Sequence, residues 1–154
     1  MWAKAAIGRA KEVASAHGLA LELHNQWLKV RAMTVSITIS VNGQSIRQIN
    51  NIPWQANMNG QDAMEHAYGS SGYSFLLQYF GPQLGYEVVS IDNIAGQSGS
   101  DAFLFWEFSV NGTVASQGVD ETILNDGDQI VWNYTIYNAA VHGGGRYAAI
   151  KQQA

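Results

Sequence analysis

The sequence predicts an α+β domain, in which a mostly antiparallel sheet carries one short helix and follows an N-terminal helical arm. Three observations predict this class. From Thr34 onward, apolar and polar residues alternate in short runs separated by Gly, Asn, Asp and Pro. One segment with helical spacing, residues 60–68, interrupts these runs. The residues before Met33 are instead rich in Ala and Leu, which favour helix.

The arm is predicted to begin as a helix of about four turns that ends at Gly18, because glycine commonly follows a helix C-terminus. Charged residues interrupt this segment repeatedly, so it does not read as a standard secretory signal peptide. A basic amphipathic helix could lie on a membrane or a nucleic acid. Its apolar stripe is mostly Ala, which favours packing on its own domain or on a neighbouring subunit. Residues 19–31 fit both a strand and a helix, and we favour the helix.

The sheet is predicted to open with a hairpin. Apolar residues alternate with Ser and Thr from Thr34 to Val41, as in a half-buried strand. The dipeptide Asn42-Gly43 follows, and both residues tolerate the positive φ angles of a two-residue turn. A second strand runs to about Ile52, where Pro53 ends it.

A short helix is predicted over residues 60–68. Asn59 is its candidate N-cap, and Asp62 lies at the positive end of the helix dipole. Glycines and serines at 69–72 close it. Further strands are predicted at Tyr73–Phe80, Tyr86–Ile94, Ala102–Val110 and Gln129–Tyr137, separated by turns at 81–82, 96–99, 111–112 and 125–128.

The strand around Trp106 is unusually apolar. Five of the six residues from Phe103 to Phe108 are apolar, which is too dense for a strand with one wet face. Either both faces are covered, or one face binds something. Trp106 and Phe108 share one face, and Phe103 and Phe105 share the other.

The charge changes sign near Met33. Residues 1–32 carry a net +3, and the rest of the chain carries −7, which together give −4. We therefore predict a helical N-terminal arm over 1–32, the sheet domain over 33–138, and a C-terminal tail over 139–154 hinged at its glycines. Opposite charges attract the arm to its own domain or to a neighbour's. We expect the arm to be needed for association and dispensable for folding.

The order of motifs from Gly60 to Thr135 resembles the domain family that is similar to the C-terminal β-domain of transcobalamin and intrinsic factor. Bacterial members of this family are often known only as domains of unknown function. The resemblance implies a β-grasp-like sheet with one helix. It rests on a helix after Gly60, the I-x-x-I-x-G pattern at 91–96, the aromatic strand with Trp106, the turn Asn111-Gly112, the run Gln117-Gly118-Val119, and Gly127-Asp128-x-Ile130-x-Trp132-x-Tyr134.

The same resemblance implies a ligand surface, since the vertebrate relatives cover one face of a corrinoid with this domain. Carried over to this chain, it puts Trp106, Phe108 and Gln117 in contact with a ligand or partner. From the residues alone, we favour the core for the aromatic side chains of this strand, Trp106 among them, because the Asn111-Gly112 turn sets the strand inside a hairpin.

Catalytic and metal chemistry find little support in the residues. The chain has no Cys, which excludes a disulfide, a thiol nucleophile and a thiolate metal site. No G-x-S-x-G motif is present. Asp62 and His66 share a helix face but lack a third ligand at a suggestive spacing. We therefore expect no catalytic residues, no metal site and no cofactor.

The function we expect is a non-catalytic, extracellular-type binding or assembly domain. It would form homo-oligomers or contact a partner protein through its sheet and terminal arms. The alternative is a module that binds a corrinoid-like small molecule or a polymer. The acidic net charge of −4 disfavours nucleic acid, and no apolar run approaches the ~20 residues of a membrane span. Charged residues make up only 13% of the chain, which favours a location outside the cell or on a particle or cell surface, although no standard signal peptide is visible.

Overall fold

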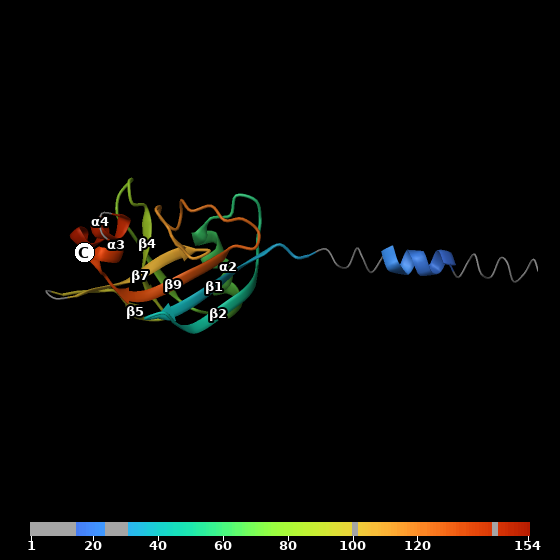
Figure 1. Ribbon diagram of the computed structural model, residues 1–154, viewed down its shortest axis with the longest axis horizontal. Helices are drawn as coiled ribbons and strands as arrows, with labels where there is room; N and C mark the ends of the chain where they lie inside the picture. The colour runs from blue at the N-terminus through green and yellow to red at the C-terminus, as the bar shows by residue number, and fades with distance from the viewer. Residues whose placement is uncertain (1–14, 24–30, 100–101, 143–144) are drawn as a thin grey trace, which may run out of the picture. The chain divides into compact units, whose positions relative to one another are not determined.

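The computed structural model describes residues 15–23, 31–99, 102–142 and 145–154 (Figure 1). The chain forms two compact units, Met1–Ala32 and Met33–Ala154.

In the first unit, residues 15–23 are helical. This helix continues through Gly18, so the predicted end at that residue is wrong. Glycine costs about 1 kcal/mol in a helix, and the Ala and Leu residues on both sides favour the helix strongly enough to carry it through. The helix favoured for 19–31 is confirmed over 19–23. The remaining parts of the arm, residues 1–14 and 24–30, lie outside the described residues.

The second unit contains a larger and a smaller sheet (Figure 1). In the larger sheet the strand order is β2-β1-β9-β7-β6, with β8 paired to β7; the smaller sheet has the order β3-β4-β5. The larger sheet consists of β1 (Thr34–Val41), β2 (Gln44–Pro53), β6 (Gln97–Ser98), β7 (Phe103–Val110), β8 (Thr113–Val114) and β9 (Gln129–Ile136). The smaller one consists of β3 (Phe75–Tyr79), β4 (Tyr86–Ile91) and β5 (Ile94–Ala95).

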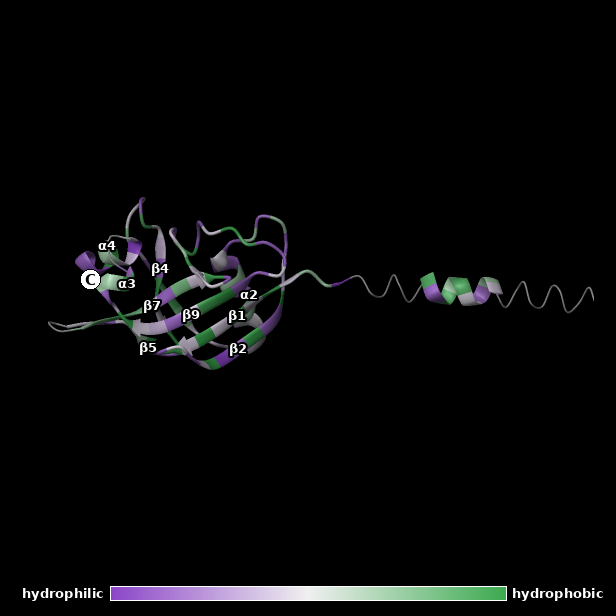
Figure 2. Ribbon diagram, viewed as in Figure 1, coloured by the Kyte–Doolittle hydropathy of each residue, from purple (hydrophilic) through white to green (hydrophobic). Residues whose placement is uncertain are grey.

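The predicted α+β class is confirmed. Among the described residues, the strand pairs are antiparallel except for β1 and β9, which run parallel in the middle of the larger sheet. Figure 2 shows apolar residues alternating along β1 and β9, the pattern from which strands were predicted. The sequence predicted neither the division into two sheets nor the parallel pair.

Turn chemistry places most strand ends as predicted. Asn42 and Gly43 have φ angles of 49° and 78°, and Asn111 and Gly112 have 52° and 79°. A further turn of this kind was missed at residues 92–93, where Asp92 and Asn93 have φ angles of 46° and 67°. It ends β4 and starts β5, so the strand predicted over Tyr86–Ile94 is divided in two.

Helix α2 (Gly60–Ser71) begins with the predicted cap. The Asn59 side chain accepts a hydrogen bond from the Asp62 backbone N–H, and the Asp62 carboxylate accepts one from the Asn59 N–H. The helix runs three residues beyond the predicted end and stops at Gly72, which has a φ of 70°. A Cβ atom at Gly60 would lie 2.9 Å from the Val119 carbonyl oxygen, so the close approach of this loop requires glycine.

Strand β7 is buried on both faces, which was one of the two interpretations of its apolar run. Trp106 and Phe108 belong to the main core, where α2 contributes Ala63, Met64 and Ala67. Phe103 and Phe105 belong to a second cluster on the other face.

The C-terminal residues cover that second face. Residues 139–154 were expected as a tail, but they belong to the second unit and form α3 (Ala139–His142) and α4 (Arg146–Gln153). Tyr147 and Ile150 of α4 are each 3% exposed and pack with Phe80, Phe103 and Phe105. The segment docks because the aromatic face of β7 would otherwise stand in water.

The burial of Trp106 predicts how much stability the domain loses when this side chain is truncated to Ala. Its side chain is 1% exposed. Trp106→Ala should therefore lower the free energy of unfolding by about 3–5 kcal/mol, because a large buried volume is removed. A urea melt followed by circular dichroism measures this. Tyr68→Ala is the control, since Tyr68 is 54% exposed on α2 and its loss should stay within about 0.5 kcal/mol. A Trp106→Ala variant as stable as the control would contradict the assignment to the core.

Candidate binding cavity beneath the C-terminal helix

A cavity of about 370 Å³ lies between the smaller sheet, β7 and α4. Its apolar wall includes Val89 of β4, Phe103 and Phe105 of β7, and Ile150 of α4. Gln78, Glu87 and Ser90 add polar groups from β3 and β4. Cavities of this size, mostly apolar with a few polar side chains, are typical small-molecule sites.

The first turn of α4 is held to the domain by polar contacts. One guanidinium nitrogen of Arg146, Nη1, lies 2.5 Å from Oε2 of Glu87, and Nη2 donates to the Tyr86 carbonyl at 3.0 Å. The hydroxyl oxygen of Tyr147 accepts a hydrogen bond of 2.6 Å from the Phe108 backbone N–H. These bonds fix α4 over β4 and β7, and so they fix one wall of the cavity.

Glu87 is the most perturbed acid of the site. Its side chain is almost fully buried, and Oε1 has no hydrogen-bond partner. Burial raises the pKa of Glu87 from its ordinary value of 4.5 to about 8, against the opposing attraction of Arg146. Burial, with the charge of Glu87, also raises the pKa of Tyr147, which therefore remains a neutral phenol.

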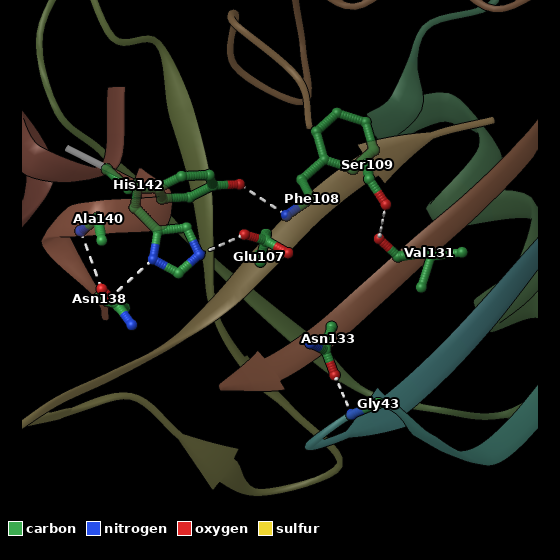
Figure 3. Close-up of polar contacts among 10 residues, drawn as sticks. Gly43, Glu107, Phe108, Ser109, Val131, Asn133, Asn138, Ala140 and His142 are labelled. Carbon is green, nitrogen blue, oxygen red and sulfur yellow. Dashed lines mark hydrogen bonds and ion pairs between the residues drawn. The ribbon is translucent and has the colours of Figure 1, made fainter. Parts of the chain in front are cut away.

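A second polar contact holds α3 beside the same face of β7 (Figure 3). Nδ1 of His142 accepts a hydrogen bond from the Asn138 backbone N–H at 2.9 Å. Its ring hydrogen is therefore on Nε2, which lies 2.7 Å from a carboxylate oxygen of Glu107. The contact with Glu107 joins α3 to β7.

No nucleophile completes this pair among the residues of Figure 3. Ser109 is the nearest hydroxyl side chain along β7, and its hydroxyl group donates to the Val131 carbonyl at 3.4 Å. A serine nucleophile needs its hydroxyl within hydrogen-bond reach of a base. The Glu107–His142 pair therefore acts here as an anchor for α3.

The three residues predicted to contact a ligand do not lie together. Trp106 lines the cavity, and its indole N–H donates to the Ile94 carbonyl at 2.8 Å. Phe108 is buried and stacks on Trp132 with ring centroids 4.7 Å apart. Gln117 is exposed on a loop beside a separate, shallower pocket. Their contact with a ligand stays a prediction.

Sequence reasoning missed Glu87 and Arg146. They are 59 positions apart, and Arg146 was assigned to the tail. One signal was available, because Arg146 is one of only three basic residues after residue 32. An isolated basic residue in a charge-poor segment is expected to pair with an acidic residue, but the sequence pattern does not indicate which one.

The described residues show neither a cluster of metal ligands nor a helix that could span a membrane. Asp62 uses its carboxylate to cap α2, while His66 lies with it beside a shallow depression. Within the described ranges, no three His, Cys, Asp or Glu side chains gather as a metal would require. None of the described helices is long and apolar enough to cross a membrane.

Residues 61–135 match a family described as a domain of unknown function (DUF4430). A comparison with curated proteins found no match. Among solved structures, the chain is similar to haptocorrin in a crystal structure titled as a complex with Cbi, with a TM-score of 0.57 and 16% identity. That similarity covers 69% of this chain and 25% of haptocorrin, so the chain spans about a quarter of haptocorrin's length.

A second similar structure comes from Ruminococcus gnavus ATCC 29149 and is titled a “putative metal binding protein”. It has a TM-score of 0.48 and 12% identity, and the match covers 68% of this chain and 98% of that one. The predicted resemblance to a domain family of unknown function with a transcobalamin-like fold is confirmed by the family match and the haptocorrin fold.

The raised pKa of Glu87 predicts a pH dependence of stability. Between pH 4.5 and about 8, the folded state holds a proton on Glu87 that the unfolded state releases. The stability that the folded state gains from binding this proton is fully present below pH 4.5, and it is lost as the pH rises through about 8. Glu87→Gln does not titrate. The urea midpoint of this variant should therefore rise relative to the parent's between about pH 5 and about pH 8.5. A constant difference across this range would contradict the shift.

Proposed function

We propose that this chain is a non-catalytic binding module and that it binds a small, mainly apolar molecule in the cavity beneath α4. Residues 61–135 of the chain match a domain family of unknown function. The cavity carries the proposal. It is open to the surface on one side, its volume is about 370 Å³, and aromatic side chains form part of its wall. Concave, mostly apolar pockets of this size are typical of small-molecule sites.

The walls indicate the kind of ligand. Phe103 and Phe105 stack at 5.6 Å on one side, and Val89 and Ile150 add aliphatic surface. Such walls favour an apolar ring or chain, since each buried Å² of apolar surface contributes about 25 cal/mol. The few polar side chains fix orientation.

The haptocorrin fold supports a binding role for this domain. The resemblance also raised a corrinoid-like ligand as an alternative. A corrinoid macrocycle is much larger than the cavity, so it would have to lie on the outer surface, where Gln117 is exposed. The cavity therefore favours a smaller molecule.

Non-catalytic action remains part of the proposal. It is supported by the Glu107–His142 pair, whose neighbouring hydroxyl group is turned to a backbone carbonyl. The charge-poor composition supports a location outside the cell or on a particle or cell surface.

Binding of naphthalene, a small apolar probe, tests whether the cavity is a binding site. The full chain should bind it, and Val89→Phe should bind at least about tenfold more weakly, because the larger ring fills the site. Ile136→Phe is the matched control, since Ile136 is 50% exposed on β9 and does not line the cavity. Calorimetry measures affinity, and circular dichroism checks the fold. Equal binding by both variants, or none by the parent, would rule out this site.

A second candidate function is self-association through the smaller sheet. Strand β3 is an edge of that sheet, and an unpaired edge can pair with a second copy of the chain. Leu76 is 64% exposed and Tyr79 54% exposed on this strand, and the Tyr79 ring lies 5.1 Å from that of Tyr86. Because side chains alternate along a strand, Leu76 and Tyr79 lie on opposite faces of β3, and each face of this edge strand carries one exposed apolar side chain.

This candidate predicts a dimer that depends on Tyr79. Sedimentation of the full chain should show dimers, and Tyr79→Ser should raise the dissociation constant about tenfold or more, because a buried aromatic ring contributes strongly to an interface. Tyr68→Ser is the matched control, because both tyrosines are 54% exposed. A monomeric parent, or an equal effect of both changes, would exclude self-association through β3.

A further inference from the structure

We propose that the turn Asn42-Gly43, between β1 and β2, is a site of spontaneous covalent modification at which Asn42 becomes isoaspartate. The dipeptide Asn-Gly occurs three times in the chain, at residues 42–43, 59–60 and 111–112. In this dipeptide the main-chain nitrogen of glycine can attack the asparagine side chain, because glycine has no Cβ to hinder the approach. The three asparagines differ in how firmly hydrogen bonds hold them.

Asn59 is held at both ends of its side-chain amide. Its oxygen accepts a hydrogen bond from the Asp62 N–H at 2.8 Å, and its nitrogen donates to the Asp120 carbonyl at 2.9 Å. The attacking nitrogen is bound as well, since the Gly60 N–H donates to the Thr122 carbonyl at 3.0 Å. Cyclisation at Asn59 must therefore break the cap of α2 and the contact of this loop.

Asn111 is also held on both sides. Its Nδ2 donates to Oδ1 of Asp128 at 2.8 Å, and its Oδ1 accepts a hydrogen bond of 2.9 Å from the Gln129 N–H. The nitrogen that would leave as ammonia is thus bound to a carboxyl oxygen, and hydrogen bonds to ionised groups are stronger than neutral ones. The side chain cannot turn toward Gly112 without losing both bonds.

Asn42 is the least restrained of the three. It is exposed at the tip of the hairpin, and none of the described residues forms a hydrogen bond with its side-chain amide. The attacking nitrogen has one restraint, because the Gly43 N–H donates to Oδ1 of Asn133 at 2.9 Å in an exposed contact (Figure 3). A single hydrogen bond therefore separates this turn from reaction.

The reaction needs only water and the base that water supplies. The Gly43 nitrogen gives up its proton and bonds to Cγ of Asn42, and Nδ2 takes up a proton and leaves as ammonia. The product is a five-membered succinimide. Water then adds to one of its two carbonyl carbons and breaks that carbon's bond to nitrogen. Breaking the original peptide bond leaves isoaspartate, and breaking the new bond leaves aspartate.

The product changes the hairpin that opens the larger sheet. Isoaspartate adds one carbon to the main chain and one negative charge to the turn, directly beside the pair Val41 and Gln44. The length of a hairpin turn sets the register of its strands. The turn does not line the cavity beneath α4, so this proposal is independent of the proposed function.

The test is to age the full chain at about pH 8 and to follow the three dipeptides by peptide mass mapping. Electron-transfer fragmentation distinguishes isoaspartate from aspartate. Asn42 should convert about tenfold or more faster than Asn59 and Asn111, because at those sites two or more hydrogen bonds must open first. In the chain unfolded by urea, the three rates should come close together, since glycine follows each asparagine.

One variant tests the restraint on Gly43. Asn133→Ala removes the acceptor and should raise the rate at Asn42 about fivefold, as the loss of one hydrogen bond would give. Asn50→Ala is the matched control, because Asn50 is an exposed asparagine of β2 and does not bond Gly43. Circular dichroism checks that both variants fold. Equal rates at Asn42 in the two variants would overturn the restraint by Asn133.

The parent alone decides whether Asn42 is the modified residue. Conversion of Asn59 or Asn111 as fast as that of Asn42 in the folded chain would overturn the proposal. Persistence of Asn42 in the folded chain, under conditions where the unfolded chain converts, would overturn it as well. Selective conversion of Asn42, lost on unfolding, supports it.

Discussion

The burial of β7 on both faces is the constraint on which the rest of this domain depends. Trp106 and Phe108 require a layer on one side, and α2 with the loop that touches Gly60 supplies it. Phe103 and Phe105 require a layer on the other, and α4 supplies that one through Tyr147 and Ile150. Because a strand alternates its side chains, neither layer can replace the other. The domain is therefore complete only when the C-terminal helices are in place.

The second layer is attached differently from the first. α2 is capped by its own residues and packs through small apolar side chains. α4 is instead held by the buried contact of Arg146 with Glu87 and by a bond between the Tyr147 hydroxyl and a backbone amide. Hydrogen bonds are directional, so these contacts fix the geometry of α4. In this domain the fixed geometry keeps α4 beside β4, and the cavity lies between them. The polar contacts of Arg146 and Tyr147 therefore position this wall of the cavity.

Local chemistry made much of the fold predictable, and long-range contacts made the rest unpredictable. The turns at Asn42-Gly43 and Asn111-Gly112 follow from the φ preferences of these residues, and the α2 cap follows from Asn59 and Asp62. The docking of α4 had only an indirect signal, the apolar excess in β7, which allowed a ligand as well as a helix. The Glu87–Arg146 pair left no local pattern, because each residue depends on a partner far along the chain. Of the predicted contact residues, Trp106 alone lines the cavity.

The parallel pairing of β1 with β9 has a consequence for how the domain forms. These strands come from the two ends of the sheet domain, and they lie side by side at the centre of the larger sheet. Contacts between distant parts of a chain slow folding, because the intervening loop must close first. During synthesis, β1 can pair only with β2 until β9 has been made. The aromatic face of β7 stays uncovered for longer, until α4 has been made. Nascent chains stopped before residue 129 should thus hold a hairpin and an open apolar surface, which chaperones would have to protect.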